Sequence, residues 1–314
     1  MVMPSQMRAP LRRPEASPTS AVGAAYSEAG QDYLTYADGD AERLFDFSSH
    51  YSFGDRYIWS LLDTKLKERR WTGAQTISIL DAGCGPGTWL RRLVTRALEL
   101  GFTGIRARGI DLAAAQIDRA RRLAHDLKAS PRVDLSFEVG DLSLPLAEAD
   151  DSFDLTLCLY CVFNHLTLSK TPALLAEIAR VTRGRFVTTV RAAGSMPTIY
   201  VDSIEHARAF RQDNATDRCE IELDNGRRIT LDSHLFTAHE LRGLVERHFA
   251  IEDLRGLDLF HGRFAPDPRW NPAAVGEGGA IAADLAGLEA TFAADPRFID
   301  RAAHLLAVGW RKRA

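Results

Sequence analysis

Candidate strands alternate with amphipathic segments from residue 77 to residue 190. An apolar, β-branched run at Ile77–Asp81 indicates a buried strand, and further strands are expected at Ile105–Ile110 and Val133–Val139. Between the first two strands, Thr88–Leu100 has a helical repeat, whose apolar face contains Leu90, Leu93, Val94, Ala97 and Leu98. Strands that alternate with helices in this way predict a parallel sheet flanked by helices.

Two further strands continue the alternation, at Ser152–Tyr160 and Arg185–Val190. The segment between them predicts a helix that opens with Thr171 as N-cap and Pro172 in its first turn. Gly184 is then expected to close this helix, because glycine readily adopts the left-handed conformation found after helix ends.

The rhythm changes after residue 192. Cys219–Leu231 predicts a β-hairpin around Asn225-Gly226, and two registers are open to it, with a two-residue or a three-residue loop. We predict the three-residue loop, because it places apolar pairs on one face and a charge pair on the other. Its pairs are Ile221 with Ile229, Cys219 with Leu231 and Glu222 with Arg228.

The remainder of the chain predicts two more strands. A capping box at Thr237 and Glu240 opens a helix over Ala238–His248, and Phe249–Leu259 reads as the sixth strand of the main sheet. Leu305–Trp310 reads as the last strand, after a helix near Ala280–Phe292. We therefore expect a flexible tail (1–20), an N-terminal helical lid (21–70), a nucleotide-binding core (71–192), an inserted substrate cap with the hairpin (193–236), and the rest of the core (237–314), which includes a helical excursion at 262–302.

Composition narrows the function. The chain has 314 residues, 46% of them hydrophobic, which suffices for a substantial core. A formal net charge of -3 argues against a nucleic-acid binder held by a basic surface, so we expect no nucleic-acid partner. The four cysteines, Cys84, Cys158, Cys161 and Cys219, lack a zinc-ligand pattern; we interpret them as buried free thiols and predict no metal.

The sequence shows neither a membrane-spanning segment nor a secretory signal. No run is apolar and long enough to cross a bilayer, and the first 20 residues contain Arg8, Arg12 and Arg13 but no apolar segment of a secretory signal. We expect a cytoplasmic protein without a membrane partner, and a homo-oligomer is left open.

The first strand ends in three glycines at alternate positions, Gly83, Gly85 and Gly87. A strand, a glycine-rich turn and a helix in this order are typical of half a nucleotide site in a doubly wound α/β fold. The spacing differs from the Gly-x-Gly-x-x-Gly of dinucleotide enzymes, because the sixth position is Thr88, and no P-loop Gly-Lys-Ser/Thr follows.

An acid follows the second strand. Asp111 stands 24 residues beyond Gly87, where a carboxylate can accept hydrogen bonds from both hydroxyls of a ribose. The alternative is that Asp111 caps the helix that begins nearby, with Leu112 and Gln116 in its first turn. We favour the ribose because the glycine turn precedes it.

Three segments together resemble class I S-adenosylmethionine (SAM)-dependent methyltransferases. Leu80–Gly87 resembles the first motif of that family, Gly140-Asp141-Leu142 the third and Phe153-Asp154 with its apolar run the fourth, although Gly140-Asp141 is also a common turn pair. The resemblance implies a Rossmann-like, doubly wound seven-stranded sheet whose last strand is antiparallel, with SAM as cofactor and S-adenosyl-L-homocysteine as product. It implies cofactor contacts from Asp81, Gly83, Cys84, Gly85, Gly87, Asp111, Leu112, Gln116, Gly140, Asp141, Leu142, Cys158, Leu159 and, in the lid, Tyr36.

The sequence gives fewer indications of the residues that would bind the methyl acceptor. His165, in the segment after the fourth strand, is the candidate base, because a histidine near neutral pKa can take a proton from an amine or hydroxyl. The alternative, which the sequence leaves open, is a structural hydrogen bond to a neighbouring loop. Further acceptor-site candidates are Tyr33, Tyr51, Tyr160, Asn164, Arg191 and Tyr200; Asn164 could equally cap a turn.

The predicted function is methyl transfer to a nitrogen or oxygen of a small-molecule metabolite by in-line displacement. The alternatives are a nucleic-acid or protein methyltransferase, or a SAM-binding protein without catalysis. No Asn/Asp-Pro-Pro-Tyr run and no Pro-Cys pair supports the nucleic-acid class. A nicotinamide oxidoreductase would need glycine in place of Thr88.

Overall fold

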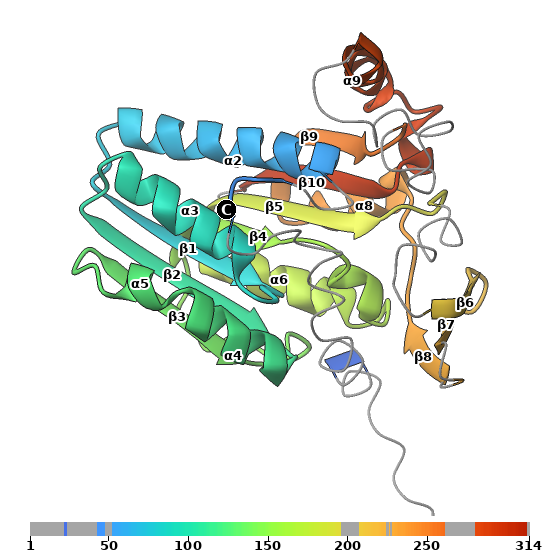
Figure 1. The fold of residues 1–314 in the computed structure, drawn as a ribbon, viewed down its shortest axis with the longest axis horizontal. Coiled ribbons are helices and arrows are strands. Elements are labelled where there is room, and N and C mark those ends of the chain that lie inside the picture. Colours follow the sequence, from blue (N-terminus) through green and yellow to red (C-terminus); the bar gives the residue numbers. More distant parts are fainter. Residues whose placement is uncertain are drawn as a thin grey trace, which may run out of the picture.

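A seven-stranded sheet forms the centre of the molecule (Figure 1). The computed structural model describes residues 22–23, 43–47, 52–195, 207–223, 226, 228–260 and 280–312. Within these ranges the sheet contains, in spatial order, β3 (Val133–Val139), β2 (Gly104–Asp111), β1 (Thr76–Ala82), β4 (Phe153–Cys158), β5 (Thr182–Arg191), β10 (His304–Arg311) and β9 (Phe249–Leu257). The first five strands are parallel, and β10 runs antiparallel to both of its neighbours. The predicted sheet is confirmed.

Helices cover both faces of the sheet (Figure 1). One face packs against α2 (Ser52–Trp71), α3 (Thr88–Glu99) and α4 (Ala114–Leu123), which is followed by the short α5 (His125–Lys128). The opposite face packs against α6 (Thr171–Val181) and α8 (Ala238–Val245). Every residue of β1 from Ile77 to Ala82 is buried, as expected for a central parallel strand with helices on both sides.

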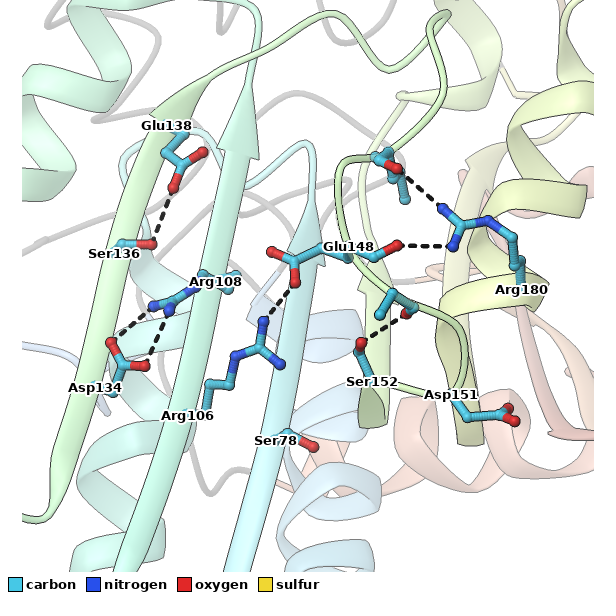
Figure 2. A network of polar contacts seen from close by, with 12 residues as sticks. Ser78, Arg106, Arg108, Asp134, Ser136, Glu138, Glu148, Asp151, Ser152 and Arg180 are labelled. Carbon is cyan, nitrogen blue, oxygen red and sulfur yellow. Dashed lines mark hydrogen bonds and ion pairs between the residues drawn. The ribbon is translucent and has the colours of Figure 1, made fainter.

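The uncovered part of the sheet is polar (Figure 2). On β2, Arg108 makes a bidentate ion pair with Asp134 of β3, both oxygens at 2.9 Å, and Arg106 pairs with Glu148 in the loop before β4. Arg180 of α6 holds the same loop from its other side through the Glu148 carbonyl, at 2.7 Å. This loop starts at Asp141, so its two anchors fix the end of the segment that leaves β3.

The helix before β5 corrects two predictions. Lys170, and not Thr171, is the N-cap of α6, and the Thr171 hydroxyl donates instead to the Thr167 carbonyl at 3.2 Å. Gly184 does not close the helix, because β5 begins directly at Thr182 and contains Gly184. The glycine is required there by close packing: a Cβ would lie 2.1 Å from the Asp154 carbonyl oxygen of β4.

A second sheet follows β5. It contains β6 (Ala207–Asp213), β7 (Arg218–Leu223) and β8 (Arg228–Asp232), and it lies beyond the carboxyl end of β5 (Figure 1). The three-residue hairpin register is confirmed for all three predicted pairs. The hairpin prediction lacked β6, whose sequence Ala-Arg-Ala-Phe-Arg-Gln-Asp contains no apolar run.

Other boundaries shift modestly. The capping box at Thr237 and Glu240 is present, but α8 ends at Val245 and not at His248. The fourth strand ends at Cys158, two residues earlier than expected. α9 (Ala280–Phe292) has the predicted bounds, and a 3-10 turn, η4 (Ile299–Arg301), leads into β10. Among the described residues no helix is both long and apolar enough to span a bilayer.

Candidate functional site

The glycine turn between β1 and α3 has an irregular backbone. All three glycines have positive φ, +86° at Gly83, +50° at Gly85 and +77° at Gly87, a region that other residues enter only at a cost. The N–H groups of Gly83 and Cys84 both donate to the Ile110 carbonyl of β2, at 2.7 and 3.0 Å. The turn is therefore attached to the end of the neighbouring strand.

The three glycines have different surroundings. A Cβ on Gly83 would lie 2.2 Å from the Val162 side chain, and one on Gly87 would lie 2.6 Å from the ring of Phe137. A Cβ on Gly85 would meet nothing within 4 Å. Gly83 and Gly87 are thus needed for packing inside the protein, whereas Gly85 faces open space at the start of α3, where backbone N–H groups favour a ligand.

Asp111 connects the glycine turn to the next loop. Its Oδ2 accepts from the Gly85 N–H and its Oδ1 from the Ala113 N–H, both at 2.8 Å. Ala113 is the N-cap residue of α4, so the carboxylate supports the start of this helix as well as the turn. Burial raises the pKa of Asp111, and the hydrogen bonds to Ala113 and Gly85 oppose that rise. Each oxygen keeps a second lone pair, so both can still accept from a ligand.

The end of β3 lies beside Asp111. The Gly140 N–H donates to the Asp111 carbonyl at 2.9 Å, and Asp141 Oδ1 accepts from the Ser143 N–H at 2.8 Å, so the predicted turn role of Asp141 is present. Leu142 is buried. Gly23 lies against Leu112, where a Cβ would come within 2.9 Å of its side chain. A piece of the N-terminal segment therefore covers this edge of the sheet.

Other predicted cofactor residues lie below this edge. Asp81 near the end of β1 and Gln116 in α4 are buried, as are Cys84, Cys158 and Leu159. Burial raises the pKa of Cys158 well above its ordinary value, so this thiol is a packing residue. Tyr33, Tyr36, Tyr51 and Tyr200 are outside the described residues.

The residues at this edge fit a nucleoside-containing cofactor. Thr88, in the first turn of α3, is 2% exposed, and its hydroxyl oxygen has no hydrogen-bond partner in the described part of the chain. Buried hydroxyls are normally paired, so an orphaned one beside Gly85 points to a missing polar neighbour. The open side of Gly85 and the remaining lone pairs of Asp111 are the other groups at this edge that could contact such a cofactor.

The segment after β4 bends sharply. Tyr160 and Cys161 have φ of +51° and +67°, values that are strained for residues with a side chain. The Tyr160 N–H donates to Thr189 Oγ1 at 2.8 Å, and its hydroxyl donates to Asp55 of α2. Burial, and then the charge of Asp55, raise the pKa of the Tyr160 hydroxyl well above its ordinary value. The strained turn thus places the Tyr160 side chain between the sheet and the start of α2.

His165 ends the 3-10 turn η1 (Phe163–His165) and faces the small sheet. Its Nδ1 lies 3.1 Å from the Asp232 carbonyl of β8. A carbonyl can only accept, so Nδ1 carries the proton and Nε2 is the accepting nitrogen of the neutral ring. Burial lowers the pKa of His165, and the hydrogen bond to Asp232 opposes this effect. The structural hydrogen bond left open by the sequence is present, and a role as base stays a prediction.

Asn164 is used inside the protein. It is buried, and its amide donates to the carbonyls of Arg191 and His234 at 3.3 and 2.5 Å, while its oxygen accepts from the Arg191 N–H at 3.0 Å. These bonds join the end of β5 to the strand that returns from the small sheet. Arg191 is brought beside His165, whose pKa its charge also lowers. Substrate contacts of Asn164 and Arg191 stay predictions.

A group of acidic residues was not expected from the sequence. Asp55 of α2, Asp258 after β9 and Glu289 of α9 are each at most 2% exposed. Asp55 and Asp258 lie near Tyr160, and Glu289 lies near Asp258. They come from segments far apart in the chain, so no local motif unites them. The available signal was Asp258 itself, an acid inside the apolar run Leu257–Phe260.

A cavity of about 330 Å³ lies at the opposite, amino-terminal edge of the sheet. It is lined by Ile77, Leu155 and Trp310 and by charged residues that include Lys65, Arg69, Asp154, Arg183 and Arg185. None of the predicted site residues contributes to it. Ligand sites of open α/β sheets lie at the carboxyl ends of the strands, so the edge with Gly85 and Asp111 is the candidate site.

Residues 79–185 match the model of a family described as a methyltransferase domain. The matched stretch starts within β1 and ends in β5, so it contains the glycine turn, Asp111 and Asp141. Among the described residues no group of three histidine, cysteine or acidic side chains could hold a metal ion, within the matched stretch or outside it.

Solved structures share the fold of residues 79–185 and of the elements around them. The [4+2]-cyclase SpnF is 17% identical, with 94% of this chain and 97% of that chain covered and a TM-score of 0.55. The CcbJ methyltransferase from Streptomyces caelestis is 12% identical, with 96% and 100% covered and a TM-score of 0.50. The PH0226 protein from Pyrococcus horikoshii OT3 is 15% identical, with 89% and 96% covered and a TM-score of 0.50. No curated protein matches the sequence.

Proposed function

We propose that this protein transfers the methyl group of SAM to a nitrogen or oxygen atom of a small-molecule metabolite. The glycine turn carries the proposal, because Gly85 alone among its three glycines faces open space and donates its N–H to Asp111. Thr88, directly after the turn, has a hydroxyl without a hydrogen-bond partner among the described residues. The family match of residues 79–185 supports the same chemistry. A formal net charge of -3 favours a small acceptor over a nucleic acid.

When bound, SAM supplies an electrophilic methyl group on a sulfonium centre. The chain's contribution is to hold the reactants in line and to exclude water, which can account for most of the rate enhancement. Asp111 stabilises the glycine turn through the Gly85 N–H and has lone pairs left for a ribose. Leu142, at the end of β3, provides a buried apolar surface, as an adenine ring requires.

His165 is the proposed general base for a methyl acceptor whose reacting nitrogen or oxygen is still protonated when it binds. The hydrogen bond from Nδ1 to the Asp232 carbonyl orients the ring and leaves Nε2 as the accepting nitrogen. Because burial lowers its pKa, the ring is neutral at pH 7 and ready to accept a proton. We expect His165 to assist turnover and to contribute little to cofactor binding.

The fold by itself leaves a second chemistry open. One of the similar structures is named a [4+2]-cyclase, and it covers nearly the whole of this chain. A protein that uses SAM only as a structural ligand would bind it without releasing S-adenosyl-L-homocysteine. Measuring S-adenosyl-L-homocysteine over time, with a set of small amines and hydroxy compounds as acceptors, separates the two functions.

The first experiment is a thermal melt of the full chain with SAM, S-adenosyl-L-homocysteine or NAD. A ligand at about 100 times its Kd adds about 2.7 kcal/mol of stability, a shift of several degrees. We expect both sulfur compounds to raise Tm and NAD to leave it unchanged. A shift with NAD alone, or with none of the three, would contradict the proposal.

A further inference from the structure

The cavity of about 330 Å³ at the amino edge of the sheet has an apolar floor. Leu66 of α2, Ile77 of β1 and Leu155 of β4 line it and are each at most 4% exposed, so they form its deepest part. Ligand pockets in proteins occupy about 300–1,000 Å³ and combine an apolar lining with a few polar groups. The cavity lies at the lower end of this range, so its size suits a small ring system.

Trp310, near the end of β10, gives the cavity an aromatic wall. The six residues before it in the strand, from His304 to Gly309, are buried, but Trp310 is 39% exposed. The Arg185 guanidinium lies over the indole ring, 4.6 Å from the ring centroid, and this cation–π contact fixes the position of the ring. The exposed part of the indole is available to stack on a flat apolar molecule.

The rim of the cavity is mainly basic. Four basic side chains line it, against the single carboxylate of Asp154. The four are Lys65, Arg69, Arg183 and Arg185. Lys65 and Arg185 pair with Glu68 and Glu252, which lie outside the lining. The guanidinium groups of Arg69 and Arg183 share Asp154.

Arg69 is the least engaged of these four cations. One terminal nitrogen pairs with Asp154 Oδ1 at 3.0 Å, and the guanidinium has no other polar partner among the described residues. Asp154 also accepts two hydrogen bonds from Arg183, both at 2.9 Å, and two from Ser78, at 2.9 and 3.0 Å. Arg183 donates further to the Asp151 carbonyl at 3.2 Å. Arg69, whose side chain is 42% exposed, therefore keeps several of its five N–H groups for an anion.

We propose that this cavity binds a flat aromatic carboxylate, with its ring against Trp310 and its negative group at Arg69. A neutral molecule of the same shape would leave the free N–H groups of Arg69 without an anion. The site is separate from the proposed SAM site, because β1 presents its amino end to the cavity and its carboxyl end to the glycine turn. The seven residues of β1 span about 20 Å, so both ligands can be bound at once. The proposal does not depend on methyl transfer.

The first test measures binding of 2-naphthoate to the full-length wild type by calorimetric titration, with and without S-adenosyl-L-homocysteine. We expect one binding site with the same Kd in both conditions. 2-Naphthalenemethanol, which has the same rings but no charge, should bind at least about 10-fold more weakly. Arg69→Met should weaken 2-naphthoate binding by the same factor. Arg122→Met, at an exposed arginine of α4, is the matched control and should leave the Kd unchanged.

The second test locates the ligand by ¹⁹F NMR of protein labelled with 5-fluorotryptophan. Trp310→Phe and Trp89→Phe assign two resonances, one at the cavity and one in the first turn of α3, beside the glycine turn. We expect 2-naphthoate to shift the Trp310 resonance and to leave the Trp89 resonance in place. Trp310→Leu should also weaken binding by about 5-fold, through the lost stacking surface.

Three results would overturn the proposal. The first is a wild type that does not bind 2-naphthoate. The second is equal affinity for the neutral alcohol, or equal affinity of the wild type and Arg69→Met. The third is a shift of the Trp89 resonance alone, which would place the ligand at the carboxyl edge. Melting curves show whether each variant is folded, and if Arg69→Met is not, an unchanged affinity in Trp310→Leu is sufficient to reject the site.

Discussion

The two edges of the main sheet surround an aspartate with opposite charges. At the amino edge, Asp154 accepts from the Ser78 N–H at 2.9 Å and pairs with Arg183 at 2.9 Å and with Arg69 at 3.0 Å. At the carboxyl edge, Asp258 has one backbone donor at 3.3 Å and two acids nearby. Burial raises the pKa of both carboxyls, but the partners of Asp154 reverse the effect and lower its pKa, whereas the neighbours of Asp258 add to it.

This difference distinguishes an edge held together by ion pairs from the edge that carries the candidate site. The amino edge contains the cavity of about 330 Å³, yet most of its charges are engaged in ion pairs, such as those of Arg185 with Glu68 and Glu252 at 3.2 and 3.0 Å. The carboxyl edge holds positive φ at Tyr160 and Cys161, and the Thr88 hydroxyl there has no hydrogen-bond partner among the described residues. Strain and an unsatisfied polar group therefore coincide with the candidate site, whereas the cavity lies at the other edge.

The largest expected effect concerns the open glycine. Gly85→Val should weaken S-adenosyl-L-homocysteine binding by more than about 100-fold, because the side chain occupies the ligand space and resists a φ of +50°. Gly101→Val is the matched control, since Gly101 also has positive φ and open space but lies after α3, at its carboxyl end. Calorimetric titration measures both; equal losses of affinity would reduce the effect to backbone strain.

The next effect tests the base at the carboxyl edge. His165→Gln should lower kcat by about 100-fold, since positioned general bases contribute at least that much, while the Kd of S-adenosyl-L-homocysteine stays constant. The wild-type rate should rise with pH along a limb centred below about 6.5, because the pKa of His165 is lowered, and stay level above it. A variant with a normal rate and the same pH profile would remove His165 from the mechanism.

The prediction for the amino edge concerns the free energy of unfolding. Asp154→Asn should destabilise the protein by about 2 kcal/mol, less than for a fully buried ion pair because the partner arginines are 42% and 45% exposed. The lowered pKa of Asp154 stabilises the wild type above about pH 4, and this stabilisation is lost as pH falls through the folded-state pKa. Urea unfolding at pH 7 and pH 3 should therefore show a smaller difference between wild type and variant at pH 3. No difference at pH 7 would break the contrast with Asp258.

The smallest effect concerns the cofactor side. Asp111→Ala should weaken S-adenosyl-L-homocysteine binding by about 1–2 kcal/mol, through lost hydrogen bonds to the ligand and to Gly85. Asp111→Asn keeps one acceptor oxygen and should lie between wild type and alanine. Unchanged affinity in both variants would remove Asp111 from the ribose site and leave it as a support for the turn.

The core of the fold could be predicted because its signals are local. The central strand β1 is buried without interruption from Ile77 to Ala82, Gly83 follows it directly, and Asp111 is the last residue of β2. The hairpin register was predictable because only one pairing put Cys219 opposite Leu231 and Glu222 opposite Arg228. In these cases residues close in sequence determine the structure.

The errors arise where distant residues decide. Gly184 has the sequence context of a helix end, but the backbone of Asp154, thirty residues earlier, requires a glycine inside β5. Asp55, Asp258 and Glu289 come together only because α2, β9 and α9 meet near Asp258. Both features depend on residues far apart in the sequence, so neither periodicity nor local motifs predict them.

The amide of Asn164 has a consequence for how this protein can change. Its bonds to Arg191 and His234, together with the bridge between Ala192 and Phe236, fasten the two ends of the small-sheet insertion to each other at the boundary of the core. These contacts hold the two ends of the insertion beside each other at the core. We therefore expect that a different insertion, grafted between the same two anchor points, would leave the seven-stranded sheet intact.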